Sequence, residues 1–212
     1  MALADPVRLG LAASLARPGG SVTGMAVSVG YDSFVKALEL LAKTFPSAPR
    51  VAVLSNPGNA AQPDAVAEVA KAGRTLGLQL RFFEARHAGE FEAAFAAMER
   101  ERITVLYVVT ESLFLQQRAQ LAQLAAKHRL PSVHTLRENV EAGGLFSYGP
   151  DLSALARRAA TYVDKILKGA RPGDLPIEQP TVFELVINLK AAKALGVTIP
   201  QDVLLRANEL IE

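Results

Sequence analysis

Short apolar runs alternate with amphipathic stretches along most of the chain. The run at 103–109 is rich in β-branched residues, which is typical of a strand buried on both faces. The stretch at 90–102 instead repeats Phe91, Phe95 and Met98 at helical spacing. Predicted strands are 50–54, 79–84, 103–109, 130–134, 145–148 and 182–189. Predicted helices are 7–16, 33–44, 64–76, 90–102, 113–129, 138–142, 152–168 and 190–195.

Between 50 and 149, strand and helix follow one another regularly. This order predicts an α/β fold with a doubly wound, mainly parallel sheet and helices on both faces. The flanking parts supply few convincing strands: one short strand near Val22 and the run at 182–189. We therefore expect one complete lobe at 50–149 and part of a second lobe, built from 1–49 and from 150–212. The Pro-rich connector 169–180 is typical of a chain that crosses between two bodies.

Amino-acid composition argues against several classes of function. The 212 residues are 50% hydrophobic and 21% charged, with a formal net charge of +2, so a globular core is expected and a nucleic-acid partner is not. There are no cysteines, which excludes thiolate metal sites and cysteine nucleophiles. The three histidines have no metal-ligand spacing, so no metal site is expected.

Enzymatic motifs are also missing. Gly19-Gly20 and Gly143-Gly144 lack the surrounding residues of a phosphate-binding loop and predict turns. Ser147 and the other serines have no nucleophile-elbow context. We expect neither a cofactor nor catalysis.

In a parallel sheet, ligands bind beyond the carboxyl ends of the strands. Polar residues stand at these ends in the predicted lobe, and they are the candidate ligand-binding residues: Ser55, Asn56, Thr110, Glu111, Thr135, Arg137 and Tyr148.

Each candidate also has a structural explanation. Ser55 and Asn56 precede Pro57-Gly58 and are equally typical of a turn. Glu111 can pair with a ligand ammonium or lie in the first turn of a helix capped by Thr110 or Ser112.

The last two of these candidates, Arg137 and Tyr148, lie near the end of the predicted lobe. Arg137 can hold a ligand carboxylate or pair with Glu138 or Glu141. Tyr148 can line a cleft or pack at a hinge.

Four segments carry a family resemblance. They are DPVRLGLAASLARPGGSVTG at 5–24, RVAVLSNPGN at 50–59, HRLPSVHTLRENVEAGGLFSYGPDL at 128–152 and YVDKILKGARPGDLPIEQPTVFELVINLKAAKALGVTIP at 162–200. The chain resembles the ABC-transporter substrate-binding protein family related to tryptophan-binding TrpX-type lipoproteins, which has the type I periplasmic-binding fold.

The resemblance implies a solute-binding component of an ABC importer, which captures a small polar molecule, such as an amino acid, between two lobes and delivers it to a membrane permease. It also implies a periplasmic or extracytoplasmic, lipoprotein-like location. Asp5 matches the family's Asp-Pro-Val turn facing the cleft, which makes it an eighth candidate; as an alternative it caps a helix starting near Val7. An effector-binding domain of a sensor or transcriptional regulator with the same fold is the alternative function.

Compared with the family, the chain opens near the last strand of the first lobe. No signal peptide is visible at its N-terminus. If the first lobe is incomplete, we expect weak or absent ligand affinity and a homodimer formed through exposed flank strands.

Overall fold

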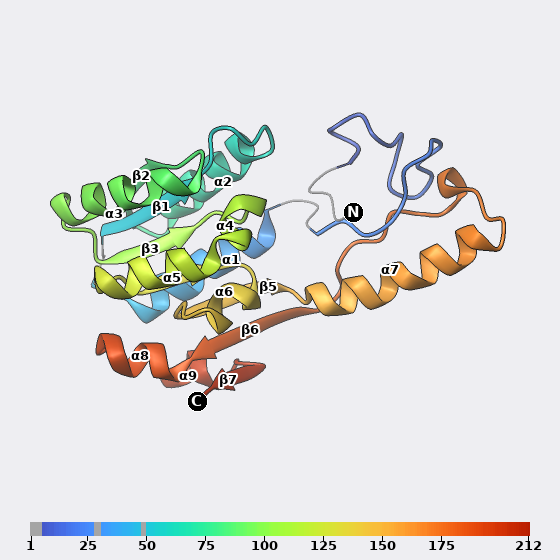
Figure 1. Cartoon of the computed structure of the whole chain (residues 1–212). Helices are drawn as coiled ribbons and strands as arrows, with labels where there is room; N and C mark the ends of the chain where they lie inside the picture. The colour runs from blue at the N-terminus through green and yellow to red at the C-terminus, as the bar shows by residue number, and fades with distance from the viewer. Residues whose placement is uncertain (1–5, 28–30, 48–49) are drawn as a thin grey trace. The chain divides into compact units, whose positions relative to one another are not determined.

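The computed structural model describes residues 6–27, 31–47 and 50–212. The helices are α1 (Asp32–Thr44), α2 (Gln62–Thr75), α3 (Phe91–Arg100), α4 (Ser112–Gln116), α5 (Arg118–Lys127), α6 (Arg137–Glu141), α7 (Leu152–Leu167), α8 (Leu189–Leu195) and α9 (Gln201–Leu204), with short 3-10 turns at Ala88–Glu90 and Pro172–Asp174. The strands are β1 (Arg50–Ser55), β2 (Gln79–Glu84), β3 (Val105–Val108), β4 (Ser132–His134), β5 (Phe146–Pro150), β6 (Phe183–Asn188) and β7 (Glu209–Ile211). Figure 1 labels most of these helices and strands along the chain.

The strands form one sheet in the order β2-β1-β3-β4-β5-β6-β7. The pairs from β2 through to β5 are parallel, and so is the pair β6–β7. At the end of β6, the Asn188 N–H donates to the carbonyl of Leu145, just before β5 begins. Since β5 and β6 are neighbours, this contact makes β6 run opposite to β5. The predicted α/β class with a mainly parallel sheet is confirmed.

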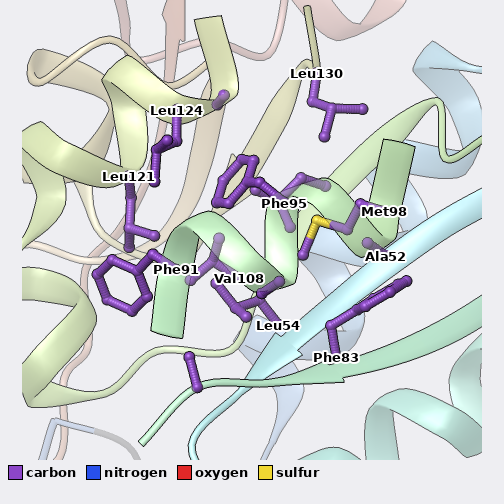
Figure 2. Close-up of a cluster of buried hydrophobic side chains, with 14 of the residues drawn as sticks. Ala52, Leu54, Phe83, Phe91, Phe95, Met98, Val108, Leu121, Leu124 and Leu130 are labelled. Atoms are coloured by element: carbon purple, nitrogen blue, oxygen red, sulfur yellow. The ribbon is translucent and has the colours of Figure 1, made fainter. Parts of the chain in front are cut away.

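Alternate residues of β1 and β3 face different helices, as the pleat requires. Ala52 and Leu54 belong to a core that includes Phe91 and Phe95 of α3 and side chains of α5 (Figure 2). On the other face, the hydroxyl of the fully buried Tyr107 donates to the carbonyl of Phe34 in α1 over 3.0 Å. Both faces of the central strands are therefore covered, which explains why the run at 105–109 is continuously apolar.

The chain divides into two compact units. Unit 1 comprises Met1–Tyr31 and Pro150–Phe183, and unit 2 comprises Asp32–Gly149 and Glu184–Glu212. The predicted lobe at 50–149 lies within unit 2, which also includes α1 and the C-terminal elements from Glu184 onward. Leu185, Val186 and Ile187 of β6 are buried in the same sheet as β5, and local sequence does not show which sheet a strand joins.

Several element predictions need correction. No helix forms at 7–16. Residues 6–10 make a single turn, in which the Gly10 N–H donates to the Val7 carbonyl, and Gly10 then adopts a φ of 70° that ends the turn. No strand forms at Val22; Met25 and Glu178 form an isolated parallel bridge instead.

The predicted helix 113–129 is two helices, α4 and α5, which meet at Gln117, whose φ and ψ of −99° and 21° depart from helical values. The predictions omitted the short α9 and β7.

Unit 1 contains the longest helix, α7. Asp151 caps this helix by accepting a hydrogen bond from the Ala154 N–H over 2.9 Å. Tyr162 is the buried residue of α7. Its hydroxyl lies 2.9 Å from Oε1 of Glu178, which also binds Arg158 through two contacts of 2.7 and 2.6 Å. Burial, followed by the bond to Glu178, raises the pKa of Tyr162 to about 12, so α7 is fastened to the 176–178 segment by a neutral phenol and an ion pair.

Candidate functional site

The carboxyl ends of β1, β3, β4 and β5 lie next to one another at one edge of the sheet in unit 2, because these four strands are parallel neighbours. Five of the predicted site residues stand at or just beyond these ends: Ser55, Asn56, Thr110, Glu111 and Thr135. Tyr148 lies within β5, two residues before its end, because the strand continues to Pro150. The sheet thus brings together residues from a span of more than ninety positions in the chain.

Glu111 is the centre of a polar cluster at this edge. Its Oε1 accepts a hydrogen bond from Nδ2 of Asn56 over 3.1 Å and one from the Leu113 N–H over 2.7 Å. Its Oε2 accepts from Nδ2 of Asn59 over 3.2 Å. Glu111 is therefore itself the cap of α4, in place of the predicted Thr110 or Ser112. The carboxylate is oriented by three donors and is half-buried.

Asn59 and Gln62 were not among the predicted site residues. Gln62, only 3% exposed, accepts the Asn56 backbone N–H on Oε1 over 2.7 Å and donates from Nε2 to the carbonyl of Val109 over 3.2 Å. It thereby joins the end of β1 to the end of β3. The sequence signal for both residues is their position in the turn and first helical turn after β1, where side-chain amides commonly bind backbone groups.

Asn56 stabilises the turn after β1 and also contacts Glu111. It is 8% exposed, and its Oδ1 accepts the Gly58 N–H over 2.9 Å. Ser55 is buried at the last position of β1, and its carbonyl accepts the Ala85 N–H over 3.0 Å. Asn56 therefore shapes the turn through Oδ1, as its structural explanation predicts, and contacts Glu111 through Nδ2. Ligand contact by Asn56 stays a prediction.

Thr110 and Thr135 join the ends of β3 and β4. Their two Oγ1 atoms are hydrogen-bonded to each other, and Thr135 is 3% exposed. Tyr148 follows on β5 and is half-buried. Asp5 lies outside the described residues.

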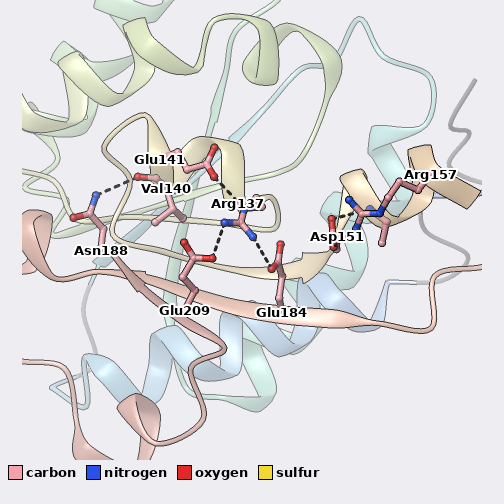
Figure 3. Close-up of polar contacts among 9 residues, drawn as sticks. Arg137, Val140, Glu141, Asp151, Arg157, Glu184, Asn188 and Glu209 are labelled. Carbon is pink, nitrogen blue, oxygen red and sulfur yellow. Dashed lines mark hydrogen bonds and ion pairs between the residues drawn. The ribbon is translucent and has the colours of Figure 1, made fainter. Parts of the chain in front are cut away.

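Arg137 follows Thr135 closely, but its side chain is engaged by three carboxylates (Figure 3). Its guanidinium donates to Glu141 at 3.0 Å, to Glu184 of β6 at 3.0 Å and to Glu209 of β7 at 2.7 Å. The bonds to Glu209 and then Glu141 raise the pKa of Arg137 above its already high ordinary value. The structural alternative, an ion pair with Glu141, is present, and the two other partners were not predicted. Binding of a ligand carboxylate by Arg137 stays a prediction, and it requires the ligand to compete with these groups.

His134 ends β4 next to this edge. Burial lowers the pKa of His134 to about 3, so its ring is neutral at physiological pH. The ring Nε2 lies 3.0 Å from Oγ of Ser132. Within residues 6–27, 31–47 and 50–212, no group of three or more His, Asp or Glu side chains is placed to hold a metal ion.

A hollow of about 420 Å³ lies elsewhere in unit 2, between α2 and β2. Arg74, Leu80 and Phe82 are among its lining residues. The hollow is separate from the polar cluster at Glu111. In the part of the chain that the structure describes, no helix combines the length and apolar character needed to span a bilayer.

Comparison with known proteins agrees with this architecture. A sequence model described as ABC transporter substrate binding protein matches residues 1–211. The chain is 27% identical over 197 residues to a "Tyrosine-binding protein" of Clostridioides difficile (strain R20291), covering 92% of this chain and 55% of that protein. The chain thus spans about half the length of this curated relative.

Two solved structures are similar over 99% of the chain. One, an ABC domain in complex with L-Trp from Streptococcus pneumoniae, has a TM-score of 0.88 and 25% identity, and 70% of it is covered. The other, a conserved domain protein from Vibrio cholerae, has a TM-score of 0.88 and 28% identity, and 69% of it is covered. A myo-inositol binding protein from Caulobacter shares the fold at a TM-score of 0.54. Because the family model matches residues 1–211 of the 212, this chain belongs to the ABC transporter substrate binding protein family.

Proposed function

We propose that this protein is the solute-binding component of an ABC-type importer, that its ligand is an amino acid, and that an aromatic amino acid is the first to test. The carboxylate of Glu111, held by Asn56, Asn59 and the Leu113 N–H, is the observation that carries the proposal. A carboxylate that is oriented before binding can accept a charge-assisted bond from a ligand ammonium with little reorganisation.

The remaining groups at the same edge suit the rest of an amino acid. The hydroxyls of Thr110 and Thr135 are donors and acceptors beside Glu111, and Tyr148 offers an aromatic surface one strand further along the sheet. Two relatives support an aromatic ligand: one is named for tyrosine binding and another was solved with L-Trp.

In this proposal the solute is captured between two lobes, and binding favours the closed arrangement by its higher affinity for that arrangement. A membrane permease of the ABC class then receives the solute, on the outer side of the membrane where this family typically works. The family match supports transport over the alternative prediction of a regulator's effector-binding domain. A homodimer through the flank strands stays a prediction.

Isothermal titration of the 212-residue chain tests the ligand class. We expect heat of binding with L-tryptophan or L-tyrosine, and a large loss with 3-(4-hydroxyphenyl)propionate, which lacks the ammonium group. Tyramine keeps the ammonium group but lacks the carboxylate, so its affinity measures how much the ligand carboxylate contributes to binding. Equal binding of the des-amino compound would remove Glu111 as the ammonium site. If no amino acid binds and a sugar or other neutral solute does, the amino-acid proposal is wrong.

A further inference from the structure

The short helix α6 contacts both ends of β6. At the beginning of β6, Arg137 donates to Oε2 of Glu184 over 3.0 Å. At its end, Nδ2 of Asn188 donates to the carbonyl of Val140 over 3.1 Å (Figure 3). Because α6 follows β4 after a two-residue link, these two contacts connect β6 to β4 through α6, in addition to the pairing of β6 with its sheet neighbours.

Glu184 has a special position in the chain. It is the first residue of unit 2 after the chain returns from unit 1, whose last residue is Phe183. The Glu184 side chain is 13% exposed and that of Arg137 is 23% exposed. A partly buried pair of this kind is less screened by solvent than a surface pair, so it constrains its two segments more strongly.

The other passage between the units lies at Gly149, the last residue of unit 2 before Pro150. A Cβ atom at position 149 would overlap the carbonyl oxygen of Thr135. Gly149 therefore packs directly on the backbone of Thr135, as close as only glycine allows. Both passages thus touch one stretch of unit 2, Thr135–Arg137.

The same stretch takes part in the candidate site. Thr135 is hydrogen-bonded to Thr110, which precedes Glu111. A ligand that moves or fixes Thr135 therefore acts on the backbone that Gly149 contacts. It also acts on Arg137, which lies two residues after Thr135 and binds Glu184.

We propose that Arg137 is a positioning residue, which fixes the start of β6 through Glu184 and so sets how freely unit 1 moves relative to unit 2. The inference rests on the proposed function, because it assigns a role to this contact in closure around a solute. Among the three carboxylates that Arg137 binds, the proposal distinguishes Glu184, which adjoins the passage, from Glu141, which lies on the same helix as Arg137.

The absence of cysteine makes a direct measurement simple. Ala160→Cys in unit 1 and Ala119→Cys in unit 2 are both exposed sites for a pair of spin or fluorescent labels. The distribution of distances between the labels is measured without ligand and with L-tryptophan, in the otherwise unchanged chain and with Glu184→Gln, Arg137→Gln or Glu141→Gln. Glu141→Gln is the matched control, because it makes the same chemical change to another partner of Arg137. Urea unfolding is measured in parallel.

We expect Glu184→Gln and Arg137→Gln to broaden the distance distribution without ligand, and Glu141→Gln to leave it unchanged. A merely structural role for the pair would lower the urea midpoint without altering the distances, and that result would overturn the inference. Equal broadening by Glu141→Gln would overturn it too. Because the ligand-free distances do not require a bound solute, failure of L-tryptophan to bind would contradict the proposed function separately from this measurement.

Discussion

The side-chain amide of Asn56 donates to Oε1 of Glu111 over 3.1 Å and so links the turn after β1 to the residue that caps α4, at the end of the loop after β3. These residues are 55 positions apart in the chain. Their contact depends on β1 and β3 being parallel neighbours in the sheet, with Val51 opposite Val105 and Leu54 opposite Val108. The Asn56–Glu111 pair leads to a direct test of the ligand site.

Glu111→Gln keeps the size of the side chain and removes its charge. We expect the affinity for L-tryptophan or L-tyrosine to fall by roughly 10- to 100-fold, because a hydrogen bond to a charged group contributes about 1.5–3 kcal/mol. Isothermal titration measures the change. Glu92→Gln is the control, since Glu92 lies on α3 and pairs with Lys127 at the surface. Unchanged affinity in Glu111→Gln would exclude the proposed contact.

Acidification is expected to destabilise unit 2 through His134. Burial lowers the pKa of His134 to about 3 in the folded protein, below its ordinary value of 6.5. The unfolded chain therefore binds more protons than the folded chain between these pH values, and stability is lost as the pH falls from about 6.5 toward 3. The stabilisation is fully present above pH 6.5.

Urea unfolding at pH 7 and pH 5 checks this expectation. For the contribution of His134 we expect a loss of about 2 kcal/mol between these pH values, since one pKa unit corresponds to about 1.4 kcal/mol. His134→Asn should remove that part of the pH dependence. His87→Asn serves as the control, because the His87 side chain is 69% exposed. If wild type and His134→Asn lose the same stability on acidification, the buried histidine is not the cause.

Gly149→Ala is expected to lower the stability of the chain by about 1–3 kcal/mol or more, because an added methyl group must displace backbone in a packed region. The affected contact is the approach of Gly149 to the carbonyl oxygen of Thr135. Gly20→Ala is the matched control, since nothing lies within 4 Å of the Cβ position at Gly20. Urea denaturation compares the two variants. A Gly149→Ala variant as stable as Gly20→Ala would show that β5 shifts away from Thr135 at little cost.

Local pattern was enough to predict much of the fold and to propose candidate site residues. The β-branched run before Thr110 predicts a strand buried on both faces, and the polar residues directly after it predict a ligand edge, because parallel strands end together. The family resemblance rested on segments of contiguous residues, and the matching family model confirms it. Strand patterns and family motifs depend only on periodicity and on residues that are neighbours in the chain, so both can be recognised from the amino-acid sequence alone.

The sequence by itself therefore determined the α/β class, most strands and helices, and Glu111 as a candidate. Only the tertiary structure decided that β6 and β7 extend the sheet of unit 2, and that Arg137 binds Glu184 and Glu209, which lie 47 and 72 positions away. The physical reason is that secondary structure follows from local propensity and apolar spacing, whereas strand pairing and ion-pair choice depend on which distant segments the whole chain brings together.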